Sequence, residues 1–370
     1  MNGVQFRKRM YGVISQPSPM IPHRSLPGLL ALSVVLALVG AATAVFAGFP
    51  SAAPLDKLRQ ARPLLVQAQT GDAAAERRRR LSAVHNWGYW LSSFEIEGLV
   101  DAPHDLMVVD SEMSANRSFV REHTPEEVVR MKRRPDGSQR VLLAYLSIGE
   151  AERYRPYWRP DWYDPPAKPV WLGHENRRWV GNFAVQYWNP DWQQLIFGTP
   201  TSYLDRILAH GFDGVYLDRA DAFFEWQRSH PSARNEMTTF IARLAEHARQ
   251  RNPQFLVVMQ NAEELLEDAA VLNAIDGIAK EDLLFGVRRA EEPNKPNDVA
   301  WSIDLLHTAQ KTGRRVLVVE YLKDPVKMMG AATRILEEGF VPYFAPRRLN
   351  CLNPPAVLGP TGNLPDHPCR

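Results

Sequence analysis

The sequence predicts an α/β fold of the (β/α)8 barrel (TIM barrel) class, with a long aromatic-rich insertion after the third strand. From residue 84 onward, eight short apolar runs alternate with helix-like segments. They span about 260 residues, which is the usual size of such a barrel. Several runs end in an acidic residue, at the edge where parallel α/β folds build their sites. A doubly wound open sheet is the alternative, but no Gly-x-Gly-x-x-Gly stretch or phosphate-binding loop supports a nucleotide-binding version of it.

The first part of the chain is predicted to lie outside the barrel. Residues 29–47 are apolar and uncharged and follow basic residues. Residues 1–48 therefore indicate either a cleaved signal peptide or an uncleaved membrane anchor, which would tether the protein to the membrane. Both alternatives predict a secreted or periplasmic protein. Residues 49–83 are rich in Ala, Gln and Pro and are expected to form a linker, with the basic run 77–80 in solvent.

The charge balance argues against a nucleic-acid partner. The formal net charge is +2, but residues 1–47 contain four basic and no acidic residues. The remaining chain therefore carries 40 basic and 42 acidic residues. A domain of this composition is not a basic nucleic-acid binder.

A Pro-rich tail is expected over residues 349–370. It contains the only cysteines of the chain, Cys351 and Cys369. In an exported protein these two are able to form one disulfide that closes the tail. They lack the number and spacing of a zinc site, and no motif in the sequence demands a metal or another cofactor.

The barrel itself is predicted to occupy residues 84–348. Its strands are expected at 87–91, 105–110, 141–150, 215–218, 255–261, 275–281, 316–321 and 339–344. A helix is expected after Thr124, because Pro and two Glu residues follow it at the first helical positions. Helical spacing also predicts helices over 192–210, 235–251, 299–312 and 325–338.

The connection between the third and fourth strands, residues 150–212, is unusually long. Connections of this length are often functional. It contains six of the ten tryptophans, Trp158, Trp162, Trp171, Trp179, Trp188 and Trp192. Most of them are expected to pack the insertion onto the barrel, because large aromatic side chains are mostly core material, while one or two contact a ligand.

The stretch 211–221 organises the rest of the chain. Gly211 ends a helical run, residues 215–217 are apolar, and Asp218 and Asp221 follow. Asp218 is expected at the C-terminal tip of a buried parallel strand, which favours a functional role. For Asp221 a role in the site and a role as the cap of the next helix remain equal alternatives.

Acidic residues recur at the predicted strand ends and are expected to ring one face of the barrel: Asp110, Glu150, Asp218, Glu281 and Glu320. Grouped carboxylates are costly unless they are hydrated, paired or used. Two carboxylates across a cleft are what glycoside hydrolysis requires. The same acids suit a divalent metal as an alternative, although histidines are scarce at the strand ends.

Four stretches resemble glycoside hydrolase family 114, a group of endo-α-1,4-polygalactosaminidase-like TIM barrels. They are Trp-Gly-Tyr-Trp-Leu at 87–91, Asp-Leu-Met-Val-Val-Asp at 105–110, Ala-Tyr-Leu-Ser-Ile-Gly-Glu-Ala-Glu-Arg-Tyr at 144–154, and Gly-Phe-Asp-Gly-Val-Tyr-Leu-Asp at 211–218. The resemblance covers roughly residues 84–346 in order. It implies a barrel that hydrolyses α-1,4-linked galactosamine polymers without a cofactor.

The resemblance also implies the roles of individual residues. Asp218 is expected as nucleophile or base and Glu281 as general acid. Substrate contacts are expected from Asp110, Tyr145, Glu150, Arg153, Gln260 and Asn261, with Asp221, Glu320 and Trp87 completing the set. Barrel packing is the alternative role for Tyr145 and Gln260.

Three alternative functions are compatible with the sequence. The first is hydrolysis of a galactosamine polymer, with a preference for partly deacetylated chains because an acidic rim attracts a cationic polymer. The second is a carbohydrate-binding barrel of the cell envelope without turnover. The third is an envelope scaffold that binds no saccharide.

Overall fold

The computed structural model describes residues 71–93, 95–115, 118–357, 363–366 and 368–369. The predicted signal or anchor segment and most of the predicted linker lie outside these residues. Among the helices in the described ranges, none combines the length and the apolar character needed to span a bilayer.

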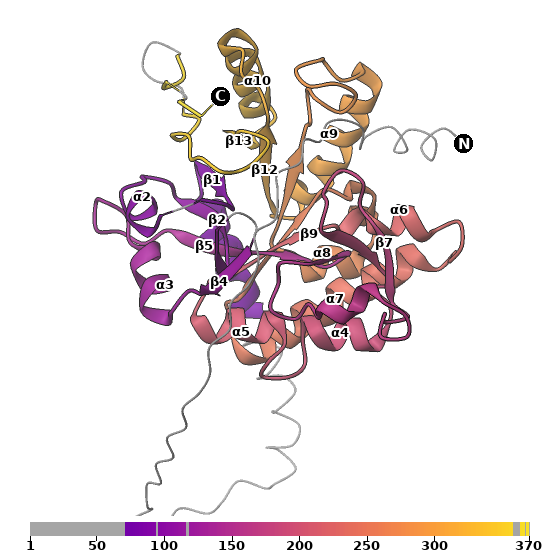
Figure 1. Ribbon diagram of the computed structural model, residues 1–370. Helices are drawn as coiled ribbons and strands as arrows, with labels where there is room; N and C mark the ends of the chain where they lie inside the picture. The colour runs from indigo at the N-terminus through magenta and orange to yellow at the C-terminus, as the bar shows by residue number, and fades with distance from the viewer. Residues whose placement is uncertain (1–70, 94, 116–117, 358–362, 367, 370) are drawn as a thin grey trace, which may run out of the picture. The chain divides into compact units, whose positions relative to one another are not determined.

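Eight parallel strands form one sheet with neighbouring strands in chain order, which confirms the predicted (β/α)8 barrel (Figure 1). All eight strand predictions are met. The strands are β1 (Trp87–Trp90), β2 (Leu106–Asp110), β5 (Val141–Ser147), β9 (Gly214–Asp218), β10 (Leu256–Gln260), β11 (Gly277–Glu281), β12 (Arg315–Glu320) and β13 (Val341–Phe344).

The first and last strands meet at the seam of the barrel. The indole N–H of Trp87 on β1 donates to the carbonyl oxygen of Val341 on β13 at 3.0 Å. The backbone N–H of Leu91, just after β1, donates to the carbonyl of Leu349 at 2.9 Å. These bonds satisfy polar groups at the sheet edges, so the barrel is nearly closed.

Side chains alternate between the two faces of each strand, as the pleat requires. One set fills the barrel interior, where Tyr89, Tyr216 and Tyr343 pack around Trp87 with Leu and Val from the other strands. The other set packs against the surrounding helices. The position of a residue within its strand therefore decides whether its side chain faces the barrel axis.

Helices cover the outside of the strands (Figure 1). They are α2 (Ile96–Val100), α3 (Pro125–Lys132), α4 (Pro190–Ile196), α5 (Tyr203–His210), α6 (Phe223–Trp226), α7 (Ala233–Arg251), α8 (Ala269–Ala274), α9 (Pro296–Lys311) and α10 (Pro325–Glu337). Thr124 caps α3 through a reciprocal pair of hydrogen bonds with Glu127, as its sequence suggests. The helix expected over 192–210 is instead two helices, because the chain breaks around Gly198, whose φ is 120°.

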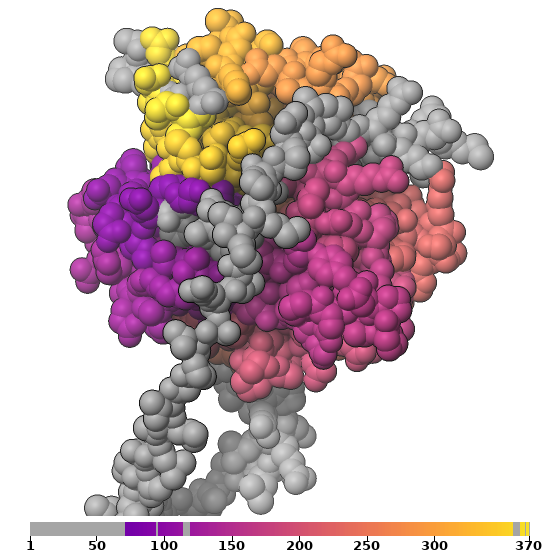
Figure 2. Space-filling model, in the orientation of Figure 1, coloured from indigo at the N-terminus to yellow at the C-terminus, as the bar shows by residue number. Residues whose placement is uncertain are grey.

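Five short strands lie outside the barrel sheet. β3 (Glu112–Ala115) pairs with β4 (Ser118–Glu122) beyond β2. β6 (Glu150–Glu152), β7 (Leu172–Glu175) and β8 (Asn182–Val185) form a three-stranded sheet within the insertion. The expected strand 141–150 thus ends at Ser147, and Glu150 begins β6. Figure 2 shows the insertion as a continuous magenta part of the surface.

The end of the predicted linker belongs to the folded domain. Residues 71–82 are helical, and Arg77 is buried with its Nε 2.9 Å from Asp276 Oδ1. Arg80 pairs with Asp213 at 2.8 Å. The expectation of a solvated basic run is therefore wrong for Arg77. The two acids lie just before β11 and β9, so these arginines neutralise carboxylates at the base of the barrel.

The C-terminal tail is joined to itself and to the barrel. Cys351 and Cys369 form a disulfide with their Cα atoms 5.8 Å apart. The side chain of Asn353, between them in sequence, accepts from the Cys369 backbone N–H at 2.9 Å and donates to the carbonyl of Phe344 at 3.0 Å. The tail is thus held against the end of β13.

Candidate active site

Polar side chains at the C-terminal strand ends gather at the mouth of the barrel. The inward-facing positions at these ends are Asp110, Tyr145, Asp218, Gln260, Glu281 and Tyr321. They come from consecutive strands β2 to β12, with Tyr321 directly after β12. This is the edge where barrel enzymes place their reacting groups.

Asp218 ends β9 and is half-buried. Its Oδ2 accepts a hydrogen bond from the Tyr145 hydroxyl on the neighbouring β5, at 2.6 Å. Its Oδ1 accepts from the backbone N–H of Arg219 at 2.7 Å. Both oxygens are therefore oriented, while the residue as a whole stays partly exposed.

Glu281 ends β11 and is also half-buried. One oxygen accepts from the amide of Gln260 and, at 3.1 Å, from that of Asn261. The other oxygen accepts from the hydroxyl of Tyr321. Three donors from the ends of the two flanking strands thus hold this carboxylate at the barrel mouth.

The two carboxyl groups are electrostatically coupled. Burial, followed by the charge of Glu281, raises the pKa of Asp218 to about 7, although the Tyr145 hydrogen bond opposes this shift. Asp218 therefore keeps its proton up to near neutral pH. Glycoside hydrolysis needs a carboxyl group that can donate a proton and a second one across the cleft.

The backbone turns sharply after each of three neighbouring strands. Arg219, Asn261 and Asp282, which follow β9, β10 and β11, have φ values of 63°, 55° and 51°. Non-glycine residues seldom adopt this left-handed conformation, and it is concentrated at functional sites. The turn at Asn261 lets its side-chain oxygen accept from the Glu281 backbone N–H at 3.1 Å while its amide donates to the Glu281 carboxylate.

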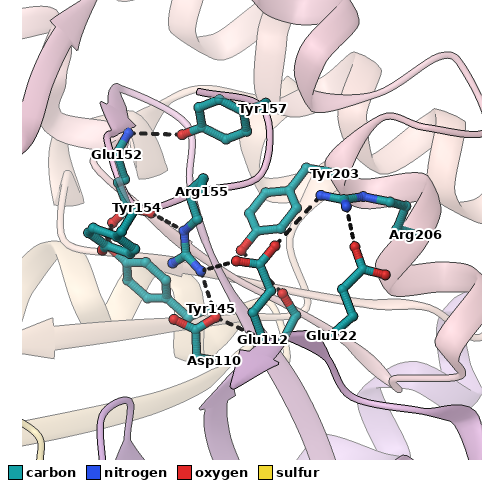
Figure 3. Close-up of polar contacts among 11 residues, drawn as sticks. Asp110, Glu112, Glu122, Tyr145, Glu152, Tyr154, Arg155, Tyr157, Tyr203 and Arg206 are labelled. Carbon is teal, nitrogen blue, oxygen red and sulfur yellow. Dashed lines mark hydrogen bonds and ion pairs between the residues drawn. The ribbon is translucent and has the colours of Figure 1, made fainter. Parts of the chain in front are cut away.

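Asp110 lies in a buried ionic cluster beside the mouth (Figure 3). The guanidinium of Arg155 is 2.6 Å from Asp110 Oδ1, 3.1 Å from Glu112 Oε2 and 2.6 Å from Glu152 Oε2. One arginine thus faces three carboxylates, and burial raises the pKa of Glu112 to about 7. Tyr154 donates to Glu152 at 2.6 Å within the same cluster.

Glu150, Arg153 and Asp221 lie on the insertion side of the mouth. Glu150 is buried, accepts from Asn176 at 2.8 Å and pairs with Arg219 at 3.3 Å. Arg153 is exposed and donates to the Tyr163 hydroxyl at 3.1 Å. Asp221 is buried, 3.7 Å from a guanidinium nitrogen of Arg219. Of these three side chains, Arg153 is the one open to solvent.

Two residues expected to contact substrate are placed elsewhere. Trp87 begins β1 and is fully buried in the interior, at the opposite end of the strand from the mouth. Glu320 has the outward orientation on β12, is fully buried, and accepts from the backbone N–H of Leu284 at 2.7 Å. The expectation that Trp87 and Glu320 contact substrate is therefore wrong. Trp87 packs in the barrel interior, and Glu320 anchors the loop after β11. Glu320 ends β12 like the other strand-end acids, but side chains alternate along the strand and the inward position falls to Tyr321.

Sequence reasoning missed Tyr321 and Arg155, which orient acids at the mouth and beside it. Tyr321 is adjacent to Glu320 and takes the inward position that Glu320 was expected to fill. Arg155 lies two residues beyond Arg153 and makes the buried contacts. Two-residue periodicity beyond each strand end would have predicted Tyr321. No sequence signal distinguishes Arg155 from Arg153, because the fold of the insertion decides which one is buried.

Within the described ranges, no group of three or more His, Cys, Asp or Glu side chains is arranged to hold a metal ion. The carboxylates at the mouth are engaged by tyrosine, amide and arginine donors.

Comparisons with known proteins agree with this architecture. The model of glycoside-hydrolase family GH114 matches residues 67–355. An uncharacterized protein of Deinococcus radiodurans is 36% identical over 276 residues, covering 74% of this chain and 83% of that protein. An uncharacterized protein of Methanocaldococcus jannaschii is 35% identical over 284 residues, covering 72% of this chain and 78% of that protein.

Two solved structures share the fold. The glycoside hydrolase domain of PelA from Pseudomonas aeruginosa has a TM-score of 0.56 and 17% identity, covering 73% of this chain and 97% of that one. Aspergillus fumigatus Ega3 in complex with galactosamine has a TM-score of 0.52 and 17% identity, covering 73% and 95%. Because the family match runs through the entire barrel, this protein belongs to glycoside-hydrolase family GH114 and is a glycosidase.

Proposed function

We propose that the protein cleaves α-1,4-linked galactosamine and N-acetylgalactosamine exopolysaccharide, with Asp218 and Glu281 as its catalytic pair. One observation carries this assignment. Of the five acids expected at the strand ends, Asp218 and Glu281 are half-buried, whereas Asp110, Glu150 and Glu320 are buried with exposures of 5%, 2% and 0%. A polymer entering the mouth therefore has access to these two carboxyl groups.

The pair supplies both functions of the reaction. One group protonates the glycosidic oxygen, and the other attacks the anomeric carbon or activates water. The family resemblance implies Glu281 as the general acid. Burial raises the pKa of Asp218 to about 7, so Asp218 also suits the role of proton donor near neutral pH. The reverse assignment, with Asp218 as the acid, is therefore the alternative.

Substrates with an activated leaving group distinguish the two assignments. A general acid becomes dispensable when the leaving group departs without protonation, whereas the other carboxylate stays essential. If Glu281 is the acid, Glu281→Gln retains much of its rate on an aryl glycoside and Asp218→Asn does not. The opposite result reverses the two roles.

The choice of polymer is supported by charge. Ega3, which shares the fold, has been crystallised with galactosamine. The acids at and around the mouth of this barrel outnumber their arginine partners, since Arg155 alone faces three carboxylates. An amine-bearing polymer is attracted to such a mouth, and added salt weakens the attraction. We expect faster turnover of partly deacetylated chains than of fully acetylated ones at low salt. Equal turnover would contradict this preference.

The insertion offers a surface for the rest of the polymer. Of its six tryptophans, Trp179 alone is strongly exposed, at 43%, while the others are buried or half-buried. Asn176 accepts from the Trp179 backbone N–H at 3.4 Å and donates to Glu150 beside the mouth at 2.8 Å. Trp179 is thus tied to the site, and its ring can stack on a sugar residue away from the cleaved bond.

Product analysis tests the function. The parent protein, Asp218→Asn and Glu281→Gln are incubated with galactosamine-containing exopolysaccharide, and Glu320→Gln serves as a matched acid-to-amide control. We expect oligosaccharide release by the parent and by Glu320→Gln, with at least a hundredfold loss in the other two at retained folding. Release by both site variants would show that the site is misplaced. Binding without release by the parent would favour a carbohydrate-binding barrel.

We also propose that the protein acts outside the cytoplasm. Residues 29–47 supply an apolar segment after basic residues, as signal peptides and anchors do. N-terminal sequencing of the exported protein would distinguish cleavage near residue 47 from retention of the segment. Recovery of the protein solely from the cytoplasm would contradict export.

A further inference from the structure

The hydroxyl of Tyr145 faces two carboxylates but has one proton to donate. Its oxygen is 2.6 Å from Asp218 Oδ2 and 3.4 Å from Glu152 Oε1. A carboxylate is a strong acceptor, so an unoccupied Glu152 would compete with Asp218 for this proton. What occupies Glu152 therefore decides how firmly Asp218 is held.

Glu152 is already engaged at both oxygens. The hydroxyl of Tyr154 donates to Oε1 at 2.6 Å, the same oxygen that Tyr145 reaches at 3.4 Å. The Nε of Arg155 donates to Oε2 at 2.6 Å. The much shorter bond from Tyr154 makes Tyr145 the weaker donor to Glu152, and its proton is left for Asp218.

The cluster around Glu152 is firmly positioned. Arg155 is also bonded to Asp110 and Glu112, and its guanidinium lies 4.8 Å from the centroid of the Tyr154 ring (Figure 3). Arg155, Asp110 and Glu112 are buried and Tyr154 is half-buried, so the cluster has little room to rearrange. Tyr154 is thus fixed in the orientation that bonds to Glu152.

We propose that Tyr154 is a positioning residue for Asp218: by occupying Glu152, it commits the proton of Tyr145 to Asp218. This inference rests on the proposed catalytic role of Asp218. The hydrogen bond from Tyr145 stabilises the ionised form of Asp218 and so lowers its pKa. Loss of the Tyr154 hydroxyl should free Glu152, draw Tyr145 away and raise the pKa of Asp218.

Other charged and titratable groups face Asp218 from the packed elements and must stay unchanged in the comparison. They are Glu281 on β11, Arg219 and Asp221 after β9, Tyr89 on β1 and Tyr216 on β9. Tyr→Phe substitutions in the Glu152 cluster alter none of them, and each removes a single oxygen atom from a retained ring.

A double-mutant cycle tests the proposal. Tyr145→Phe, Tyr154→Phe and the double variant are compared with the parent by the pH dependence of kcat/KM. Tyr157→Phe is the matched control, because the Tyr157 hydroxyl accepts from the Glu152 backbone N–H at 2.9 Å and donates to neither carboxylate of interest. The limb of the pH profile that reports Asp218 moves to higher pH when its pKa rises, whether Asp218 acts as acid or base.

We expect each single variant to move this limb upward by about 1 pH unit or more, the scale of one lost hydrogen bond to a charged group. The double variant should match Tyr145→Phe alone, since Tyr154 acts through the proton of Tyr145. Tyr157→Phe should leave the limb in place. An unchanged limb in Tyr154→Phe, or additive shifts in the double variant, would overturn the proposal.

A second readout separates this proposal from the proposed function. The carboxyl carbon of Asp218 is titrated by NMR in protein labelled at aspartate, with Asp218→Asn identifying the resonance. If Asp218→Asn remains active, the catalytic assignment fails, yet the titration still shows whether Tyr154→Phe raises the Asp218 pKa. Active Asp218→Asn with this shift would retain the positioning and reject the catalytic role. No shift would reject the positioning.

Discussion

The hydroxyl of Tyr321 donates a hydrogen bond to Glu281 across the ends of β12 and β11. The partner oxygen of the same carboxylate accepts from Gln260 and Asn261. The pair thus mirrors Tyr145 and Asp218, in which a tyrosine from a neighbouring strand also holds an acid. Each proposed catalytic carboxyl group has its own tyrosine at the barrel mouth, where Tyr145 is buried and Tyr321 is half-buried.

Tyr321→Phe removes the hydroxyl that orients one oxygen of Glu281. We expect kcat on the polymer to fall about 10- to 100-fold while folding is retained, because a donor to a reacting carboxylate is lost. Steady-state kinetics measure the loss. Tyr187→Phe is the control, since its buried hydroxyl donates to the Ala233 carbonyl away from the mouth. Equal losses in both variants would indicate a general structural effect.

Glu320→Gln should stabilise the protein at alkaline pH. Burial raises the pKa of Glu320 to about 8, from 4.5 when unfolded. The folded state therefore favours the protonated form, and the parent loses this stability as the pH rises toward and through about 8. The neutral amide avoids that loss, so the free energy of unfolding at pH 9 should rise by about 2–4 kcal/mol relative to the difference at pH 5.

Denaturant titrations of the parent and Glu320→Gln at pH 5, 7 and 9 measure this difference. Glu337→Gln, at an exposed position of α10, should show the same pH dependence as the parent. A constant gap between Glu320→Gln and the parent across this range would show that Glu320 does not titrate between these values.

Arg155→Met should be strongly destabilising. The substitution leaves Asp110, Glu112 and Glu152 in a buried cluster without their shared cation. Removal of one partner from a buried ionic group costs about 3–5 kcal/mol. Arg121→Met, which breaks the exposed pair with Glu127, should cost less than about 1 kcal/mol. Chemical denaturation of both variants at pH 7 measures the loss in the free energy of unfolding. Similar losses in the two variants would contradict the prediction that Arg155 is needed to neutralise the buried carboxylates.

Trp179→Ala should weaken binding of long chains more than of short ones. We expect KM for the polymer to rise about 5- to 30-fold, corresponding to about 1–2 kcal/mol of lost ring contact, with little change for a disaccharide-length substrate. Trp301→Ala is the control, because Trp301 has a similar exposure on α9. If both substitutions leave KM unchanged, the polymer does not use the Trp179 surface.

The strand positions were predictable because each strand is an apolar run bounded by turn residues and acids. Asp218 and Glu281 were predictable for the same reason, since each is the last residue of such a run. Glu320 also ends a strand but faces outward. Its neighbour Tyr321 faces inward instead. Because successive side chains of a strand point to opposite faces, an offset of one residue decides which of the two enters the barrel mouth.

The sequence by itself determined the barrel, the order of its strands and the acids at their tips, because these follow from local periodicity and from the ends of buried strands. Only the tertiary structure decided which acids reach the mouth, which arginine is buried and which tyrosine holds each carboxylate. Arg153 and Arg155 differ little as sequence, yet Arg155 meets three carboxylates from β2, β3 and β6. Such contacts join residues far apart in the chain, and the packing of the insertion against the barrel alone brings them together.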